Sequence, residues 1–457
     1  MNPAIEQPIS DISDRLTSLR EQLTDIEWVT APLQVKRLSR DFNWFSPILK
    51  ARFAECFADL IAVPKTEEQI QKIAAACARL QIPLTIRGGG TGNYGQAVPM
   101  RGGLVLDMSS YNQLIQVKSG VARAQAGIRL ASLEDELRPL GWELRCMPST
   151  YRVATLGGLF AGGFGGIGSV NFGPLASLGT LLGIRVMTLE VEPRIIELRA
   201  EQMMDLAHAY GTNGIVLELE IALAPAQNWD EYLLAFPDAD KAFDFAESLA
   251  HAPALVKRNV ALYDSRIAEY FRPLAEHLRP DEHFVISPIA EQSAEALEQL
   301  LKAHNGRIAF FQSAKTAQSG HTLLEYCWNH CTLHALKVDK NLTYLQSSYT
   351  PGQERAQLRF IQETAGAELL SHVEFIRAPS GKIVCSGLPI VRYSNAQRLE
   401  ELILLHREQG IKINNPHVYT LEDGKHAGNV NPRMLELKCL YDPHHLLNPG
   451  KIRSILR

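Results

Sequence analysis

The stretch Ile86-Arg87-Gly88-Gly89-Gly90-Thr91-Gly92 decides the fold, because it places a run of glycines directly after a strand-like segment. Glycine costs up to about 1 kcal/mol in a regular element, so it is kept where the backbone needs a positive φ or a close approach. Successive N–H groups in such a turn form a concave site for an anion. The loop lacks the G-x-G-x-x-G pattern of a Rossmann loop and the Lys-Ser/Thr ending of a Walker loop. We therefore predict an anion-binding loop outside both of those folds.

A second glycine cluster lies in residues 155–184, which carry ten glycines and no charged side chain. An uncharged stretch of this length resembles a membrane span, but so many glycines, with Asn171 and Pro174, would break a helix in lipid. We predict no membrane span. A tight hairpin is the alternative for one glycine run alone. Two such clusters, each flanked by strand-like runs, indicate two walls of one extended ligand site.

The surrounding pattern predicts an α+β protein. Thr66 and Gln69 form a capping box that opens a helix between a strand ending at Val63 and a strand over 82–86. Residues 104–127 are typical of a strand meander, and we place the first domain boundary at Pro225. The remaining predicted elements are helices over 130–140, 240–251 and 293–304 and strands over 182–189, 215–223, 307–311, 342–346, 372–376 and 383–386.

Composition limits the classes of partner. At 457 residues the chain is too long for a single core. Its 46 basic and 50 acidic residues give a net charge of −4, and no Lys/Arg block exceeds a pair, which argues against nucleic acid and favours a small molecule. The seven scattered cysteines are typical of reduced thiols. The N-terminal segment is acidic where a signal peptide is basic, so we expect a cytoplasmic protein.

The order of the motifs indicates a family. The segments, in chain order, are Val63-Pro64-Lys65-Thr66, Ile86 to Gly92, Ala126-Gly127, Pro148-Ser149, Thr155-Leu156-Gly157-Gly158, Gly211-Thr212-Asn213-Gly214-Ile215 and Leu447-Asn448-Pro449-Gly450-Lys451-Ile452. Over residues 55–225 and the last ten to fifteen, the chain resembles the vanillyl-alcohol oxidase/p-cresol methylhydroxylase (PCMH-type) flavoprotein superfamily. The resemblance implies a PCMH-type two-subdomain FAD-binding domain at 55–225, followed by an α+β substrate-cap domain at 226–430. A helical extension at 1–54 would precede them, and residues 431–457 would return to the FAD domain.

The same resemblance implies the FAD contacts. The expected set is Arg87, Gly88, Gly89, Gly90, Thr91 and Gly92 around the pyrophosphate, Pro148, Ser149, Thr155, Gly157, Gly158 and Gly162 along the dinucleotide, Gly214 and Ile215 at the adenine or ribose, and Asn448 in the terminal motif. Members that tether FAD through histidine carry it in the first glycine loop, where Thr91 stands. Bicovalent members add a cysteine where Tyr151 stands, and Cys146 lies five residues away. We therefore expect non-covalent FAD.

The candidate catalytic residues lie in the cap. Pro416-His417, followed by Val418-Tyr419, resembles the proline-histidine step of sugar-lactone and alditol oxidases, although the tryptophan and lysine that follow there are missing. His372-Val373-Glu374-Phe375 is similar to their glutamate-bearing strand, and strand alternation puts His372 and Glu374 on one face. We expect the base among His417, Glu374, His372 and Tyr419, with His330 and Tyr344 as further substrate contacts. The alternative is a surface histidine or a solvated strand face.

Two segments raise the question of a metal. Cys327, His330, Cys331 and His334 are spaced by threes and fours, but on a helix they do not converge on one point. A buried aromatic-thiol segment is the simpler interpretation. The D-2-hydroxy-acid dehydrogenase branch carries a metal motif that His426-Ala427-Gly428-Asn429-Val430-Asn431-Pro432 matches in a single histidine. We predict no metal.

Together these features predict an FAD-dependent oxidoreductase that removes a hydride from a C–H bond of a small alcohol, sugar-like polyol or lactol, or hydroxy acid. O2 or another acceptor would then reoxidise the flavin. Two alternatives remain open at this point. One is a non-catalytic flavoprotein subunit that passes electrons within a complex, and the other is an NADPH-dependent reductase on a similar fold.

Overall fold

The computed structural model describes residues 11–424 and 430–455. Its first sheet has the strand order β1-β2-β4-β3, with β1 at Glu27–Val29, β2 at Leu60–Val63, β4 at Leu104–Asp107 and β3 at Leu84–Arg87. Strands β2, β4 and β3 are parallel, and α4 (Glu67–Leu80) joins β2 to β3. Thr66 caps α4 as predicted, since Gln69 N donates to Thr66 Oγ1 at 3.2 Å, but the side chain of Gln69 accepts at 2.7 Å from the N–H of Lys65 and not from that of Thr66. This sheet delivers the chain to the first glycine loop.

A second, antiparallel sheet follows. Its strands are β5 (Leu114–Lys118), β6 (Val121–Gln125), β7 (Trp142–Leu144), β8 (Leu181–Met187), β9 (Ile195–Arg199) and β10 (Ile215–Pro225), with α5 (Leu130–Leu137), α6 (Leu156–Gly162) and α7 (Ser169–Phe172) between them. The meander predicted over 104–127 is wrong in its first part. Only β5 and β6 form a hairpin, whereas the wholly buried β4 pairs in parallel with β2 and β3. A continuous apolar run is typical of such a buried parallel strand.

The third unit, called the cap below, holds an eight-stranded antiparallel sheet and a small three-stranded sheet. The large sheet consists of β14 (Arg307–Gln312), β11 (Trp229–Phe236), β13 (His283–Ala290), β12 (Ala261–Tyr263), β18 (His372–Arg377), β19 (Ile383–Gly387), β16 (Ser347–Ser348) and β21 (Lys412–Ile413). The small one consists of β15 (Leu342–Tyr344), β20 (Ile390–Arg392) and β17 (Leu369–Leu370). The helices of the cap include α9 (Ala239–His251), α11 (Ala294–Ala303), α13 (Asn329–Val338), α14 (Glu354–Ala365) and α15 (Ala396–Glu408).

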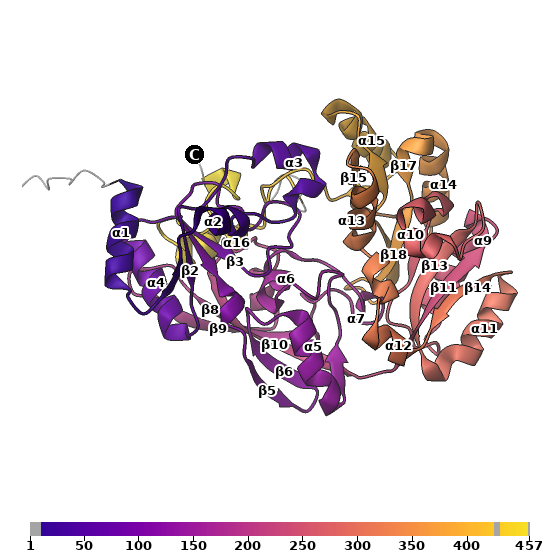
Figure 1. Cartoon of the computed structure of the whole chain (residues 1–457), viewed down its shortest axis with the longest axis horizontal. Coiled ribbons are helices and arrows are strands. Elements are labelled where there is room, and N and C mark those ends of the chain that lie inside the picture. The colour runs from indigo at the N-terminus through magenta and orange to yellow at the C-terminus, as the bar shows by residue number, and fades with distance from the viewer. Residues whose placement is uncertain (1–10, 425–429, 456–457) are drawn as a thin grey trace, which may run out of the picture.

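Both ends of the chain contribute to the first half of the molecule. The segment expected to be a helical extension contains helices α1 (Ile12–Gln22), α2 (Pro32–Leu38) and α3 (Pro47–Arg52) and also strand β1. Strand β1 pairs with β2 and lengthens the first sheet. In Figure 1 the yellow C-terminal helix α16 (Pro432–Tyr441) lies beside the indigo N-terminal elements, away from the orange cap. Within the described ranges, no helix has both the length and the apolar character needed to cross a bilayer.

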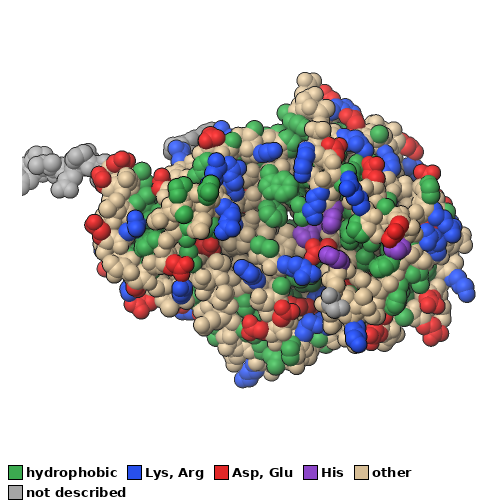
Figure 2. Space-filling model, viewed as in Figure 1, with side chains coloured by type: hydrophobic (Ala, Val, Ile, Leu, Met, Phe, Trp, Pro, Cys, Tyr) green, Lys and Arg blue, Asp and Glu red, His purple; other side chains and the backbone are tan. Residues whose placement is uncertain are grey.

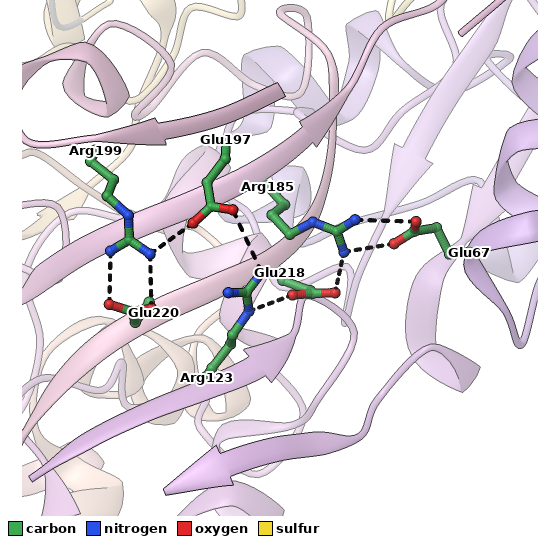
Figure 3. Close-up of polar contacts among 7 residues, drawn as sticks. All are labelled: Glu67, Arg123, Arg185, Glu197, Arg199, Glu218 and Glu220. Carbon is green, nitrogen blue, oxygen red and sulfur yellow. Dashed lines mark hydrogen bonds and ion pairs between the residues drawn. The ribbon is translucent and has the colours of Figure 1, made fainter. Parts of the chain in front are cut away.

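A network of ion pairs joins α4 to the second sheet (Figure 3). Glu218, whose side chain is 9% exposed, receives Arg185 at 2.5 Å and Arg123 at 2.6 Å, and Arg185 also reaches Glu67 of α4 at 2.8 Å. Burial by itself would lower the pKa of Arg185, but Glu67 and Glu218 outweigh it and raise that pKa. The network therefore fastens one subdomain to the other through partly desolvated charges, and Glu218 lies at its centre.

His417 is a second fastening point, between the cap and the N-terminal segment. Its Nδ1 lies 2.8 Å from Ser46 Oγ and its Nε2 lies 3.0 Å from the carbonyl oxygen of Tyr344. Ser46 Oγ already accepts the N–H of Leu49 at the start of α3, so its hydrogen is directed to Nδ1 and Nε2–H donates to Tyr344. Burial lowers the pKa of His417 to about 4. Both ring nitrogens of this neutral imidazole are therefore used within the protein.

We expect Glu218→Gln to lower the free energy of unfolding by about 1–3 kcal/mol, because two partly buried guanidinium groups lose their shared partner. Glu197→Gln is the matched control, since this glutamate belongs to the same network with a side chain 45% exposed, and we expect a change below about 1 kcal/mol. Urea denaturation of both variants is the measurement. Equal losses of unfolding free energy in the two variants would show that the buried carboxylate of Glu218 contributes no more than the exposed one of Glu197.

We also expect His417 to make the folded protein sensitive to acid. Its pKa falls from about 6.5 in the unfolded chain to about 4 in the folded one, so its stabilising effect is complete above pH 6.5 and is lost as the pH falls towards 4. Urea midpoints of the wild type should fall more steeply over this window than those of His417→Gln, which does not titrate. His251→Gln, at an exposed helix end, is the control and should follow the wild type. Parallel curves for wild type and His417→Gln would contradict the expectation.

Candidate functional site

A large cavity lies between the first two sheets and the cap, and it holds about 1860 Å³ of space free of protein atoms, part of it open to solvent. Figure 2 shows histidine side chains gathered at the centre of this face, where the two halves of the molecule meet. The first half contributes both glycine clusters, residues 208–214 and an aromatic wall. The cap contributes a mostly polar wall formed by Trp328, Asn329, His330, Gln346, Ser386, Leu388, Asn414 and Asn415.

The two glycine clusters contact each other. A Cβ atom at Gly88 would overlap Thr155 Oγ1, and one at Gly89 would overlap the carbonyl oxygen of Val153. Gly90 has a φ of +64°, and a Cβ there would overlap the guanidinium of Arg87. Thr155 in turn caps α6 by accepting the N–H of Gly158 at 3.2 Å. The glycines therefore let two loops close into one continuous wall, which leaves backbone on the cavity side.

Most of the predicted cofactor residues line this cavity. They are Gly88, Gly89, Gly90, Thr91, Gly92, Pro148, Ser149, Thr155, Gly157, Gly158, Gly162 and Gly214. Such an extended wall of small residues and backbone groups fits a dinucleotide. Asn329 adds a further indication, because its buried Oδ1 has no hydrogen-bond partner within the protein and borders the same space. The residues present therefore fit FAD.

The other three predicted cofactor residues stand behind the wall. Arg87 donates to the carbonyl oxygen of Arg40 at 2.7 Å from beneath the Gly90 turn. Ile215 begins β10 and is fully buried. Asn448 Nδ2 donates to the carbonyl oxygens of Gln96 (2.7 Å) and Tyr210 (2.6 Å), so it fastens the C-terminal segment to two lining residues. These three residues therefore support the lining loops from behind.

The four predicted catalytic residues do not line the cavity. His417 is occupied as described above, and Tyr419 lies against Phe53 with ring centroids 5.5 Å apart. His372 and Glu374 are fully buried and contact each other at 3.0 Å, as their shared strand face predicts. Tyr344 is equally buried, and its hydroxyl accepts from Asn93 Nδ2 at 3.0 Å. In this arrangement none of these side chains reaches a ligand in the cavity directly.

Glu374 nevertheless acts on the cavity wall through Trp328. Glu374 Oε1 accepts the backbone N–H of Trp328 at 2.7 Å, and Oε2 accepts from Asn259 Nδ2 at 2.8 Å. Asn259 Oδ1 receives the indole N–H of the same tryptophan at 3.2 Å. Trp328 has a φ of +53°, a strained conformation for a residue with a side chain. The buried carboxylate therefore holds a strained residue at the start of α13.

His330, in the first turn of α13, brings an imidazole to the cap side of the cavity. Its Nδ1 lies 3.0 Å from Glu325 Oε2, and Glu325 Oε1 accepts from Arg152 Nε at 2.7 Å. Burial by itself would raise the pKa of Glu325, but His330 and Arg152 outweigh it and lower that pKa to about 2. An ionised carboxylate thus faces a histidine that borders the cavity.

The segment that carries Cys327, Cys331 and His334 packs within the cap. Cys327 and Cys331 are fully buried, and burial raises the pKa of each thiol well above its usual value. His334 stacks on Tyr326 with ring centroids 4.5 Å apart. Across the described part of the chain, no three His, Cys, Asp or Glu side chains gather as metal ligands would. His426 lies outside the described residues.

Several lining residues were not predicted from the sequence. Phe42 and Phe45 come from the N-terminal segment and stack with centroids 5.9 Å apart, and the run Asp41-Phe42-Asn43-Trp44-Phe45 was the available signal. Tyr94 follows the first glycine loop and donates its hydroxyl to Gln346 Oε1 of the cap at 2.5 Å. Nothing local in the sequence indicates this last pairing, because it joins positions 252 residues apart.

The positions considered for a covalent tether differ in their access to the cavity. Thr91 lines it and lies 3.4 Å from the hydroxyl of Thr150. Cys146 is buried with its thiol 3.4 Å from Ser169 Oγ, and burial raises its pKa to about 11. Neither Cys146 nor Tyr151 is among the described residues that line the cavity.

Comparison with known proteins agrees with this geometry. Residues 58–191 match the family described as "FAD binding domain". The glycolate oxidase subunit GlcD of Bacillus subtilis (strain 168) is 23% identical over 86% of this chain and 88% of its own length. A D-lactate dehydrogenase of Archaeoglobus fulgidus is 28% identical over 48% of each chain. The solved structure of an alkyldihydroxyacetonephosphate synthase superposes with a TM-score of 0.73 at 16% identity, over 98% of this chain and 87% of that one, which shows a shared fold.

The matched domain spans the first glycine loop, α6 and the strands that carry them, so the cavity wall and the family match coincide. The cofactor of this cavity is FAD. The chain thus carries an FAD binding domain and is an FAD-linked oxidase or dehydrogenase, and it shares its fold with PCMH-type flavoproteins.

Proposed function

We propose that this enzyme oxidises a small hydroxylated compound by removing the hydride from the carbon that bears the hydroxyl group, with His330 as the base. The observation that carries the proposal is the position of His330 on the cap wall, opposite the glycine loops, with the Glu325 carboxylate 3.0 Å from Nδ1. FAD, when bound, supplies the hydride acceptor. Because Glu325 faces Nδ1, Nε2 is the nitrogen that accepts the hydroxyl proton.

Neighbouring side chains support a hydroxylated substrate. Asn329, Gln346, Asn414 and Asn415 bring amide groups to the cap side of the cavity, and each offers both a donor and an acceptor to a hydroxyl group. Trp328 and Phe45 provide apolar surface beside them. Two of the similar proteins are named for glycolate and D-lactate, both of which are 2-hydroxy acids. Small 2-hydroxy acids are therefore the first substrates to test, with the corresponding neutral diols beside them.

A second candidate function is that of an electron-transferring subunit without a substrate of its own. The name of the Bacillus relative, a glycolate oxidase subunit, favours an assembly in which electrons leave the flavin for another protein. The two functions differ in one measurable respect. Only the enzyme itself would let a hydroxylated substrate bleach the flavin of the isolated chain in the absence of oxygen.

We also propose that FAD is held without a covalent bond, since threonine stands at position 91 and Cys146 is buried away from the cavity. In a cytoplasmic setting, O2 or a further acceptor would take the electrons.

We expect His330→Asn to slow anaerobic flavin reduction by at least about 100-fold, because a positioned general base contributes roughly 10²–10⁴-fold. Stopped-flow absorbance with glycolate, D-lactate, ethylene glycol and 1,2-propanediol gives the rates and separates acid from neutral substrates. His251→Asn is the control, since this histidine lies at the exposed end of α9, outside the cavity lining. If His330→Asn has normal FAD content and an undiminished rate, His330 is not the base. If none of the hydroxylated compounds bleaches the flavin, the result supports the second function, an electron-transferring subunit.

We expect acid precipitation of the purified protein to release all flavin into the supernatant, since no covalent bond retains it. The measurement is flavin absorbance in the supernatant and in the washed, redissolved pellet. Colour that stays with the pellet would contradict non-covalent binding. Mass spectrometry of the intact denatured chain is the control, and it should give the mass of the polypeptide without flavin.

A further inference from the structure

A short chain of charges connects the FAD domain to the proposed base in the cap. Arg152 Nε donates to Glu325 Oε1 at 2.7 Å, and Glu325 Oε2 lies 3.0 Å from His330 Nδ1. The guanidinium of Arg152 is also fixed on its other side, over the ring of Tyr151 at 5.3 Å. Each carboxylate oxygen of Glu325 thus serves one partner, and the two partners belong to different halves of the molecule.

The position of Arg152 links this chain of charges to the cofactor loop. Thr150, Ala154 and Thr155 all line the cavity, and Arg152 lies between them in sequence. The same loop fits against the first glycine cluster, where the Val153 carbonyl occupies the space that a side chain at Gly89 would need. A shift of the loop that holds the dinucleotide would therefore move Arg152 as well.

Glu325 lies in a 3₁₀ turn, Leu323–Tyr326, directly before the strained Trp328. The backbone of Trp328 is held by Glu374, so the start of α13 is fixed from beneath. Glu325 lies beside the ring of His330, with Oε2 3.0 Å from Nδ1. One carboxylate thus supports the backbone before the imidazole, and a second lies against its ring.

The electrostatics of the contact suit a proton-accepting histidine. The Glu325 carboxylate lies beside one ring nitrogen of His330, so the other ring nitrogen is the one left for a substrate. The other titratable groups near the ring are Arg152 on the loop and His334 on the same helix. Arg152 lowers the proton affinity of Glu325 and keeps this carboxylate charged.

We propose that Glu325 is a positioning residue for His330, and that Arg152 makes this positioning depend on the FAD loop, so that the base is assembled when cap and cofactor loop are both in place. The proposal rests on the proposed function, because it requires His330 to act on the substrate. The side chain of Arg152 is 56% exposed, so its ion pair with Glu325 contributes little to stability. The proposal gives this ion pair a role in the reaction instead.

The first test is anaerobic flavin reduction by Glu325→Gln, measured from acidic to alkaline pH. We expect a rate at least about tenfold lower, and an acid limb of the pH profile displaced to lower pH, because the neutral amide no longer favours the protonated imidazole. Glu368→Gln is the matched control, since it breaks another ion pair of the cap, Arg398–Glu368 at 2.7 Å, outside the cavity lining. Its rate and profile should equal those of the wild type.

The second test addresses Arg152 without relying on turnover. In protein with labelled histidines, the NMR signal of His330, assigned through His330→Asn, should change when FAD is added to the apoprotein. We expect this change to be reduced by at least half in Arg152→Gln, at an FAD affinity within about threefold of the wild type. The Glu368→Gln control should keep the full change.

The outcomes distinguish the positioning role of Glu325 and Arg152 from the proposed function. Slow reduction in His330→Asn with an unaltered rate and pH profile in Glu325→Gln overturns the positioning role and leaves the proposed function standing. Wild-type rates in both variants overturn both. A His330 signal that responds to FAD equally in wild type and Arg152→Gln overturns the link to the cofactor loop.

Discussion

The close contact between the two glycine clusters is the constraint on which the rest of the site depends. Side chains at Gly88 or Gly89 would occupy the space of Thr155 and of the Val153 carbonyl, so the two loops can meet only because these positions lack a Cβ. Where they meet, backbone amides form a continuous wall, and Thr155 begins α6 at the same place. The wall suits a dinucleotide because its glycines leave backbone groups accessible and carry no side chains that would fill the space.

The proposed base, His330, comes from the cap. The eight-stranded sheet places it indirectly, because its strand β18 carries Glu374, and Glu374 holds the strained Trp328 at the cavity edge. His330 follows two residues later. Stored strain at Trp328 is tolerated because a buried carboxylate and Asn259 satisfy its backbone and indole N–H groups.

Most residues predicted around FAD line the cavity, whereas none of the predicted catalytic residues does. Twelve of the residues expected around FAD line the cavity, since glycine loops after strands depend on local conformation. Glu374 and His372 do share a strand face, as alternation predicts, but that face is buried beneath Trp328. His417 belongs to a polar tie with Ser46 and Tyr344 across the N-terminal segment, and no local pattern reveals such a tie. Strand β11, which is wholly buried, and β13, which is buried except at His283, likewise escaped prediction, because they show no alternation.

The sequence by itself determined the FAD-binding class, because the order and spacing of glycine motifs encode backbone conformations that few residues other than glycine adopt. It also determined that His330 and Glu325 lie close along the chain. Only the tertiary structure decided which histidines border the cavity, which carboxylate supports the backbone before His330, and which arginine of the other half completes the contact. Those choices depend on contacts such as Arg152 with Glu325, which join residues 173 positions apart and which packing alone brings together.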